Sequence, residues 1–174
     1  MGRVVQEEAR PDLPALGWQV AAWVPQSEIS LPLPRVSVFR VENPDAVKWL
    51  DAELVTSLNR EALYEGETHG LNPGSSLQGA LNRPYTHLAY GGASDYVELA
   101  AVYGVAITKA HAFLDGNKRT ALLATGLFLV LNGFLFDYPV YDDRAAEIFE
   151  QVAEGAAGVE ELAEWIGRHA APIG

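Results

Sequence analysis

The stretch KAHAFLDGNKRTALLATGLFLVLNG, Lys109–Gly133, joins a short polar segment to a long apolar run. From Asn117 to Leu131 the run is hydrophobic on nearly every side, and Asn132-Gly133 after it is a helix-stop signal. It predicts a helix over 117–131 at the centre of a core. Lys118 and Arg119 fall in the first turn of this helix. A helix N-terminus favours anions, because its unpaired N–H groups and the peptide dipole are positive there.

The two cations and the residues before them fit an anion site. Gly116 and Asn117 form a small loop that leads into free N–H groups, which is the geometry that cradles phosphate oxygens. A bound anion would also offset the repulsion between Lys118 and Arg119. Cations in the first turn of a helix break the preference of its N-terminus for anions. Such a break without visible compensation indicates function.

Three further residues complete a candidate phosphoryl-transfer site. His111 is the candidate general base, because an ordinary histidine pKa of ~6.5 allows it to accept a proton near neutral pH. Asp115 is the candidate magnesium ligand, since Mg²⁺ commonly bridges a carboxylate and nucleotide phosphates. Phe113 is expected to point inward and anchor the loop.

Each of these residues alone is more often structural. A histidine at a helix end usually caps or packs, and an aspartate before Gly-Asn is an ordinary turn residue. Lys118 and Arg119 could be a solvated pair. His111 and Asp115 could also begin a zinc site, but the segment offers no third ligand. The combination of five such residues in one short segment of an acidic protein favours the functional interpretation: His111, Phe113, Asp115, Lys118 and Arg119.

Composition limits the class of protein. The chain has 174 residues, 49% hydrophobic and 20% charged, which is typical of an ordinary globular domain. A net charge of −11 argues against a general nucleic-acid binder, because an acidic surface repels the phosphate backbone. There is no cysteine, which fits a reducing compartment. With no signal-peptide pattern and no apolar run of membrane-spanning length, we expect a soluble cytoplasmic protein without membrane contact.

Residues 1–45 differ in character from the rest, because they hold six of the ten prolines, which exclude long helices. Two segments, WQVAAWV (residues 18–24) and RVSVFRV (residues 35–41), are typical of short extended pieces. We therefore expect an N-terminal extension over 1–45 that is extended and partly strand-forming, and a helical domain over 46–174. A plain structural addition is the favoured interpretation of the extension, and a cover for the site, an antitoxin contact or a dimer contact are the alternatives.

The first part of the helical domain predicts two elements. NPDAVKWLDAELVTSLNREALYEG predicts one or two amphipathic helices that begin near Asn43 or Asp45 and end at Gly66. SLQGALNRP predicts a short helix that stops before Pro84. The side chains expected to be buried in the first element recur at steps of three and four: Val47, Leu50, Leu54, Leu58 and Ala62.

The later segments predict the remaining helices. SDYVELAAVYGVAITKA predicts a helix that is capped by Ser94 or Asp95, with Glu98 in a capping box, and that delivers His111 at its end. FLFDYPVY is a short extended piece. DRAAEIFEQVAEG and GVEELAEWIGRHA predict two more amphipathic helices, the last burying Trp165. The fold class is therefore mainly α.

HAFLDGNKRTA, residues 111–121, resembles the signature of the Fic/Doc superfamily, and specifically of the Doc toxins, His-x-Phe-x-Asp-(Gly/Ala)-Asn-Lys-Arg-Thr. The similarity extends in order and spacing from Val47 to the C-terminus. It implies a compact helical bundle and nucleotide-dependent transfer onto a protein hydroxyl. Roughly the first 45 residues lie outside it.

Two positions favour the Doc branch of this superfamily. AMP-transferring Fic proteins read Gly-Asn-Gly-Arg-x-x-Arg after the acidic residue, whereas here Lys118 takes the place of the second glycine and Leu122 that of the last arginine. The resemblance then implies a reversed nucleotide and transfer of the γ-phosphoryl group. An AMP transferase, or a helical module that binds nucleotide or peptide without turnover, are the alternatives.

Carried over by position, the resemblance makes His111 the residue that activates the target hydroxyl and Asp115 the ligand of Mg²⁺. The phosphates of ATP would contact the next four residues, Gly116, Asn117, Lys118 and Arg119. For the Doc toxins the target is a threonine of elongation factor Tu, and its phosphorylation stops translation. A cognate antitoxin neutralises such a toxin.

Other polar residues carry weaker signals. Arg83 is a candidate nucleotide or target contact, although an arginine before a proline can simply cap its helix. Ser57–Glu61 comes close to the inhibitory motif of many Fic proteins, but it coincides with the first core helix, and we interpret it as coincidence. The remaining histidines have no motif around them and are expected to be surface or packing residues: His69, His87 and His169.

Overall fold

The computed structural model describes residues 39–91, 95–137 and 143–174. These residues form six α-helices, a short 3₁₀-helix at Pro44–Ala46 and one two-stranded sheet, so the mainly α fold is confirmed. Most of the extension predicted over 1–45, including the segment WQVAAWV, lies outside the described residues. The domain boundary after residue 45 stays a prediction.

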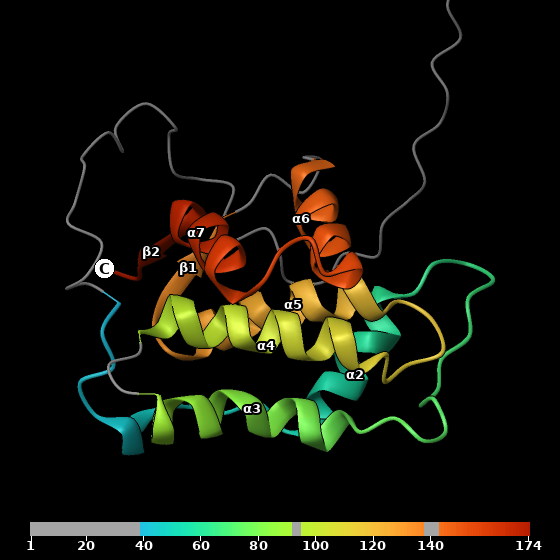
Figure 1. Ribbon diagram of the computed structural model, residues 1–174, viewed down its shortest axis with the longest axis horizontal. Coiled ribbons are helices and arrows are strands. Elements are labelled where there is room, and N and C mark those ends of the chain that lie inside the picture. Colours follow the sequence, from blue (N-terminus) through green and yellow to red (C-terminus); the bar gives the residue numbers. More distant parts are fainter. Residues whose placement is uncertain (1–38, 92–94, 138–142) are drawn as a thin grey trace, which may run out of the picture. The chain divides into compact units, whose positions relative to one another are not determined.

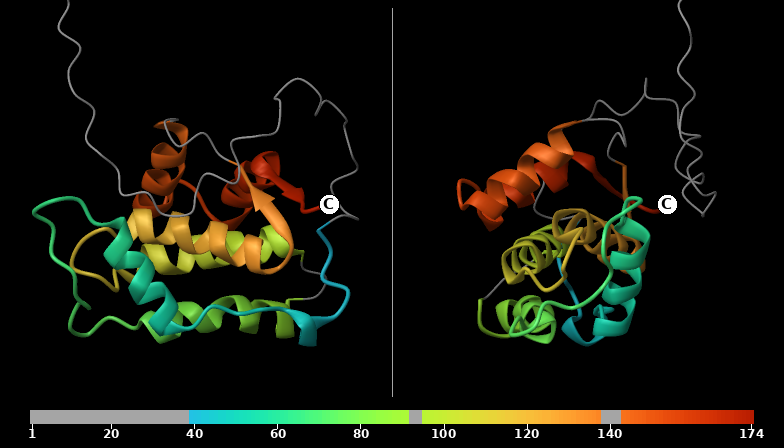
Figure 2. Two further views of the ribbon diagram at one scale, coloured as in Figure 1. Left: turned by 180° about the vertical axis from the view of Figure 1, so that it is seen from behind. Right: turned by 90° about the vertical axis from the view of Figure 1, so that its right-hand side faces the viewer.

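The helices are arranged in three tiers (Figures 1 and 2). The tiers are α2 and α3 on one side, α4 and α5 in the middle, and α6 and α7 on the other side. Their bounds are Ala52–Ala62 (α2), Leu77–Tyr90 (α3), Tyr96–Ala110 (α4), Asn117–Leu131 (α5), Asp143–Glu154 (α6) and Val159–His169 (α7). The sheet pairs β1 (Phe134–Phe136) with β2 (Ala170–Pro172) in antiparallel register, with Phe134 opposite Pro172.

The most central helix is α4, which contacts α3, α5, α6 and α7. Its Tyr103 side chain is fully buried, and the Tyr103 ring centroid lies 5.0 Å from that of Phe128 on α5. Gly104 permits the close packing, since a Cβ there would lie 2.7 Å from Leu162 Cδ2 on α7. The bounds predicted for α5 are confirmed. The helix lies in the middle tier and contacts α2, α4, α6 and β1, although Val130 near its end is 48% exposed.

The start of α2 differs from the sequence prediction. The helix begins after Asp51, whose Oδ1 accepts a hydrogen bond from Leu54 N at 2.8 Å, while Asn43 caps only the 3₁₀-helix. Of the side chains expected to be buried, Val47, Leu50 and Ala62 are buried, whereas Leu54 and Leu58 are partly buried against the core. The fully buried residues of α2 are Val55 and Asn59. The aspartate cap decides this register, because it satisfies an N–H group that would otherwise be unpaired.

Two other expectations about helix ends are wrong. Helix α3 continues through Pro84 to Tyr90, because Pro84 is buried and the ring of the next residue, Tyr85, packs edge-on against Trp49 with 5.7 Å between the ring centroids. This packing offsets the backbone hydrogen bond that a proline removes. Helix α4 is capped by Asp95 as expected, but Glu98 pairs with His87 Nε2 at 2.7 Å instead of closing a capping box. No helix in the described part of the chain is both long and apolar enough to cross a bilayer.

Candidate active site

The site is built around the motif loop, residues 111–116, which joins α4 to α5. His111 ends α4 in the left-handed conformation, with φ 44° and ψ 44°, and so turns the chain out of the helix. Phe113 is fully buried, which confirms its expected inward position. Asn117 fastens the loop from the α5 side, because its Oδ1 accepts from Phe113 N at 2.9 Å and its Nδ2 donates to Phe113 O at 2.7 Å.

A second segment, the flanking segment of residues 63–76, runs along the motif loop. Leu71 pairs with Phe113 in an antiparallel bridge, and Leu114 N donates to Gly70 O at 2.9 Å. Asn72 Nδ2 donates to His111 O at 3.0 Å, so the backbone of the candidate base is also held. A stretch with the composition of an ordinary loop therefore forms one wall of the site.

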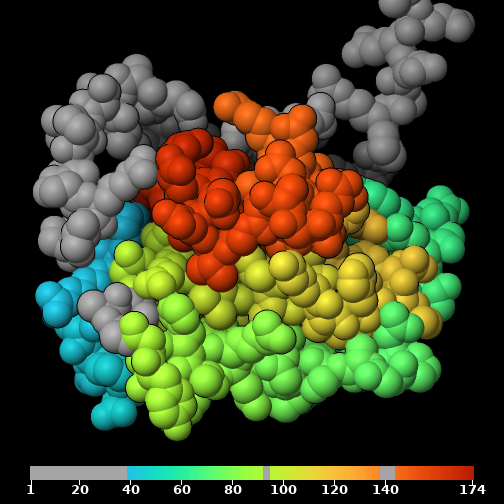
Figure 3. Space-filling model, in the orientation of Figure 1, coloured from blue at the N-terminus to red at the C-terminus, as the bar shows by residue number. Residues whose placement is uncertain are grey.

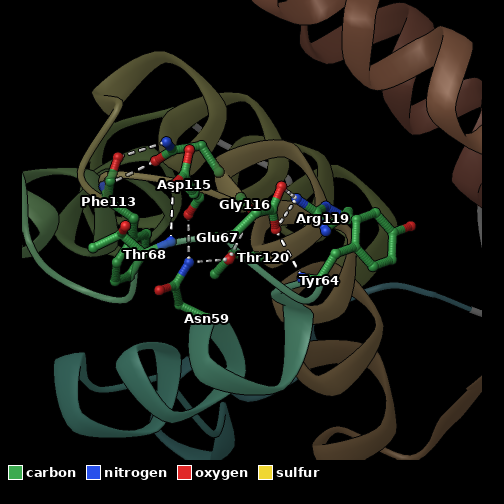
Figure 4. Close-up of polar contacts among 10 residues, drawn as sticks. Asn59, Tyr64, Glu67, Thr68, Phe113, Asp115, Gly116, Arg119 and Thr120 are labelled. Atoms are coloured by element: carbon green, nitrogen blue, oxygen red, sulfur yellow. Dashed lines mark hydrogen bonds and ion pairs between the residues drawn. The ribbon is translucent and has the colours of Figure 1, made fainter. Parts of the chain in front are cut away.

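Asn59 of α2 connects the two segments from below (Figure 4). Its side chain is fully buried, and Nδ2 donates to Asp115 O at 2.9 Å and to Thr120 Oγ1 at 3.0 Å. On its other side Oδ1 lies 2.9 Å from His69 Nδ1. His69 was expected to be a surface or packing residue, and the structure places it at the edge of this network.

The Asp115 carboxylate is half-buried and held in one orientation, because its Oδ2 accepts a hydrogen bond from Thr68 N at 2.9 Å. Its Oδ1 receives no hydrogen bond from the described residues. One fixed carboxylate with a free oxygen fits Mg²⁺, which usually takes one or two carboxylates and completes its shell with phosphates and water. The described residues contain no cluster of three side chains that could hold a metal alone.

The N-terminus of α5 lacks a side-chain cap. Gly116 occupies the cap position with φ 75°, and Thr120 returns both its N–H and its hydroxyl to Gly116 O at 2.9 Å. A Cβ at Gly116 would lie 3.1 Å from Leu63 Cδ2 and 3.3 Å from Asn59 Nδ2, so the turn suits glycine in both space and conformation. The first-turn N–H groups remain available to an anion.

The two cations of α5 have acidic partners that sequence reasoning missed. Lys118 Nζ pairs with Glu150 Oε2 of α6, and Arg119 Nη2 donates to both carboxylate oxygens of Glu67 at 2.6 and 2.7 Å. The Arg119 guanidinium also lies 3.9 Å from the centroid of the Tyr64 ring (Figure 4). The cations are therefore compensated within the chain, whereas the sequence showed no compensation for them.

The Arg119 pair has an electrostatic signature. The hydrogen bond from Arg119, and then that from Tyr64 N, lower the pKa of Glu67 below its ordinary value. Arg119 Nη1 is buried and has no hydrogen-bond partner among the described residues. The guanidinium thus gives one nitrogen to Glu67 and keeps a second donor unused.

The His111 side chain is exposed and makes no hydrogen bond with the described residues. Of the residues predicted for the site, Asp115 and Gly116 lie against Asn59, Asn117 holds Phe113, and Lys118 reaches toward α6. Asn59 could have been found from its spacing, because it follows Val55 by one turn on the buried face of α2 and is polar. Glu67 and Glu150 carry no comparable signal.

Comparison with known proteins identifies the family of the chain. Residues 44–129 match the model of the Fic/DOC family. The chain belongs to the Fic/DOC family. A relative from Escherichia phage P1, named protein kinase doc, is 33% identical over 117 residues, which cover 67% of this chain and 90% of the phage protein.

Proposed function

We propose that the chain is a Doc-type protein kinase that transfers the γ-phosphoryl group of ATP to a hydroxyl of another protein. The observation that carries this proposal is the N-terminus of α5, which has no side-chain cap and presents Lys118 and Arg119. Such a helix end favours phosphate oxygens. The name of the phage relative supports phosphoryl transfer. So do Lys118 and Leu122, which stand where AMP-transferring Fic proteins have glycine and arginine.

In this mechanism His111 acts as the general base. Its exposed ring can accept the proton of the target hydroxyl while the hydroxyl oxygen forms a bond to the γ-phosphorus. The bond between the γ-phosphorus and the β–γ bridging oxygen breaks, and ADP leaves with that electron pair. The proton passes from His111 to solvent, which restores the base for the next cycle.

The remaining residues orient the nucleotide. The N–H groups that follow Gly116 would face the phosphate oxygens, and Arg119 Nη1 is a buried donor without a partner among the described residues. Mg²⁺ bound to Asp115 would neutralise charge on the phosphates. The Glu67 carboxylate that holds Arg119 is negatively charged, as is a phosphate, so the two would compete for the guanidinium. We therefore infer that nucleotide binding loosens the pair of Glu67 and Arg119.

The target that we propose is a threonine of elongation factor Tu, with arrest of translation in the cytoplasm as the result. The resemblance of HAFLDGNKRT to the Doc toxins supports this target, and it also supports a cognate antitoxin as the natural inhibitor. Incubation of the full chain with purified elongation factor Tu and ATP labelled at the γ position tests the proposal directly.

The expected result is γ label on one protein, lost in His111→Ala and Asp115→Ala variants whose circular dichroism and melting temperature stay close to wild type. His169→Ala is the matched control, because its ring lies tilted against that of Trp165 in α7, with 4.7 Å between the ring centroids, and has no part in the site. Transfer of α label instead would identify an AMP transferase. Nucleotide binding by calorimetry, with no label on any protein of a lysate, would identify a binding module.

A further inference from the structure

A hollow with a volume of about 270 Å³ lies between α3 and α4, next to the motif loop. Figure 1 shows that the two helices run side by side in opposite directions, so that the start of α3 and the end of α4 lie together. The space-filling view shows the two helices adjacent on one face (Figure 3). The α4 side of the hollow is lined up to Ala110, directly before His111.

The hollow is lined by two basic residues and otherwise by small side chains. Arg83 from α3 and Lys109 from α4 are the charged residues that line it, and neither has an ion-pair partner among the described residues. This contrasts with Lys118 and Arg119 nearby, which both pair with glutamates. In a chain of net charge −11, two unpaired cations in one hollow attract an anion.

The other lining residues create the space and add polar groups. Gly79, Ala80, Ala106 and Ala110 leave it open, since larger side chains at these positions would enter it. Ser76 Oγ accepts a hydrogen bond from Gly79 N at 2.9 Å, so its own hydroxyl hydrogen remains available. The volume is far above the ~30 Å³ that one water occupies in the liquid, so a side chain can enter.

The position of the hollow favours the protein substrate over the nucleotide. No residue of α5 or α6 lines it, whereas the proposed phosphate site is the N-terminus of α5. It also has no aromatic lining on which a base could stack. A substrate polypeptide whose hydroxyl lies at His111 would run past one of two surfaces. One is Leu71, which is 55% exposed, and the other is the end of α4, which borders the hollow.

We propose that this hollow binds an acidic side chain of the polypeptide substrate, close in sequence to the hydroxyl that is phosphorylated. Arg83 and Lys109 hold the carboxylate, and so select for acidic residues beside the target hydroxyl. The inference rests on the proposed kinase function and names the substrate class of the same site. It also gives Arg83 a role in target recognition rather than in nucleotide binding.

The test uses the full chain, ATP labelled at the γ position, and threonine peptides that differ only by Glu, Gln or Lys at one position near the threonine. Wild type should phosphorylate the best Glu peptide about tenfold more efficiently in kcat/KM than its Lys counterpart, mainly through KM. The Arg83→Glu/Lys109→Glu double variant should reverse this preference. The Lys48→Glu/Arg60→Glu double variant is the control, because it makes the same change in net charge at exposed positions outside the hollow.

Two results of the peptide assay would overturn the inference while the kinase function stands. One is equal phosphorylation of Glu and Lys peptides by wild type and by the Arg83→Glu/Lys109→Glu variant. The other is a higher KM for ATP in that variant with the peptide preference unchanged, which would assign the cations to the nucleotide.

Failure of the kinase function is recognised separately by fluorescence anisotropy with a labelled Glu-rich peptide and no ATP. If no peptide is phosphorylated, binding of this peptide by wild type and its loss in the Arg83→Glu/Lys109→Glu variant would retain an acidic-peptide site without the kinase. Absence of both phosphorylation and binding would overturn the inference together with the proposed function.

Discussion

Removal of the Asn59 side chain should destabilise the fold and loosen the motif loop. In the Asn59→Ala variant, Asp115 O and Thr120 Oγ1 lose the hydrogen bonds that Asn59 Nδ2 donates. Thr120 keeps its own bond to Gly116 O, but Asp115 O receives no other hydrogen bond from the described residues. The contact with His69 matters less, because water can replace Asn59 at that exposed ring.

The size of the effect follows from these contacts. Each hydrogen bond donated by Asn59 contributes about 1 kcal/mol net, which gives about 2 kcal/mol for the pair. A small cavity costs roughly 0.5 kcal/mol more, and the better helix propensity of alanine returns a similar amount. We therefore expect a loss of about 2 kcal/mol in the free energy of unfolding and a melting temperature roughly 4–8 °C lower.

Urea denaturation followed by circular dichroism measures this loss. Asn82→Ala is the matched control, since the Asn82 side chain accepts a single exposed hydrogen bond, from Gln78 Nε2 on α3, and its removal should change stability by less than about 0.5 kcal/mol. A double-mutant cycle between Asn59→Ala and Thr120→Val should give a coupling of about 1 kcal/mol. If Asn59→Ala unfolds within about 0.5 kcal/mol of wild type, Asn59 is not the anchor of the motif loop.

Gly116→Ala should lower the free energy of unfolding by about 1–2 kcal/mol, because φ is 75° and the new Cβ would lie 3.1 Å from Leu63 Cδ2; an unchanged urea midpoint would contradict this. Glu67→Gln should tighten ADP binding in calorimetry, because Arg119 is then released from a carboxylate; an equal or weaker affinity would count against competition at this arginine. Burial raises the pKa of Tyr103 to about 12. The folded state therefore holds this proton more tightly than the unfolded state, and the free energy of unfolding should fall as the pH rises from about 10 to about 12. Tyr103→Phe should remove that part of the alkaline slope, and identical slopes in the two proteins would refute the assignment.

Local signals predicted part of the fold well. The bounds of α5 and the Asp95 cap of α4 follow from caps and periodicity, which act within a few residues. The continuation of α3 through Pro84 was not predictable in this way, because it depends on burial and on the contact between Tyr85 and Trp49. Contacts between elements override local preferences where the two conflict.

In the candidate site, too, local sequence signals predicted some features, and contacts between distant elements determined the others. The motif loop could be identified from its residues, because their order within one short segment is unusual. Glu67 lies 52 residues before Arg119 in the sequence, and no periodicity links the two. Asn59 is intermediate, since a buried polar residue on a helix face can be suspected, but its partner Asp115 O belongs to another element. The compensation of the two cations therefore needed the structure.

The left-handed backbone of His111 places the proposed base at a position where the fold itself would prefer glycine. For a residue with a Cβ this conformation costs about 1 kcal/mol. Replacement by glycine should therefore relieve strain while it abolishes phosphoryl transfer. A selection of random variants for heat resistance alone would then enrich inactive proteins at position 111, so only a selection that also scores activity would keep the histidine.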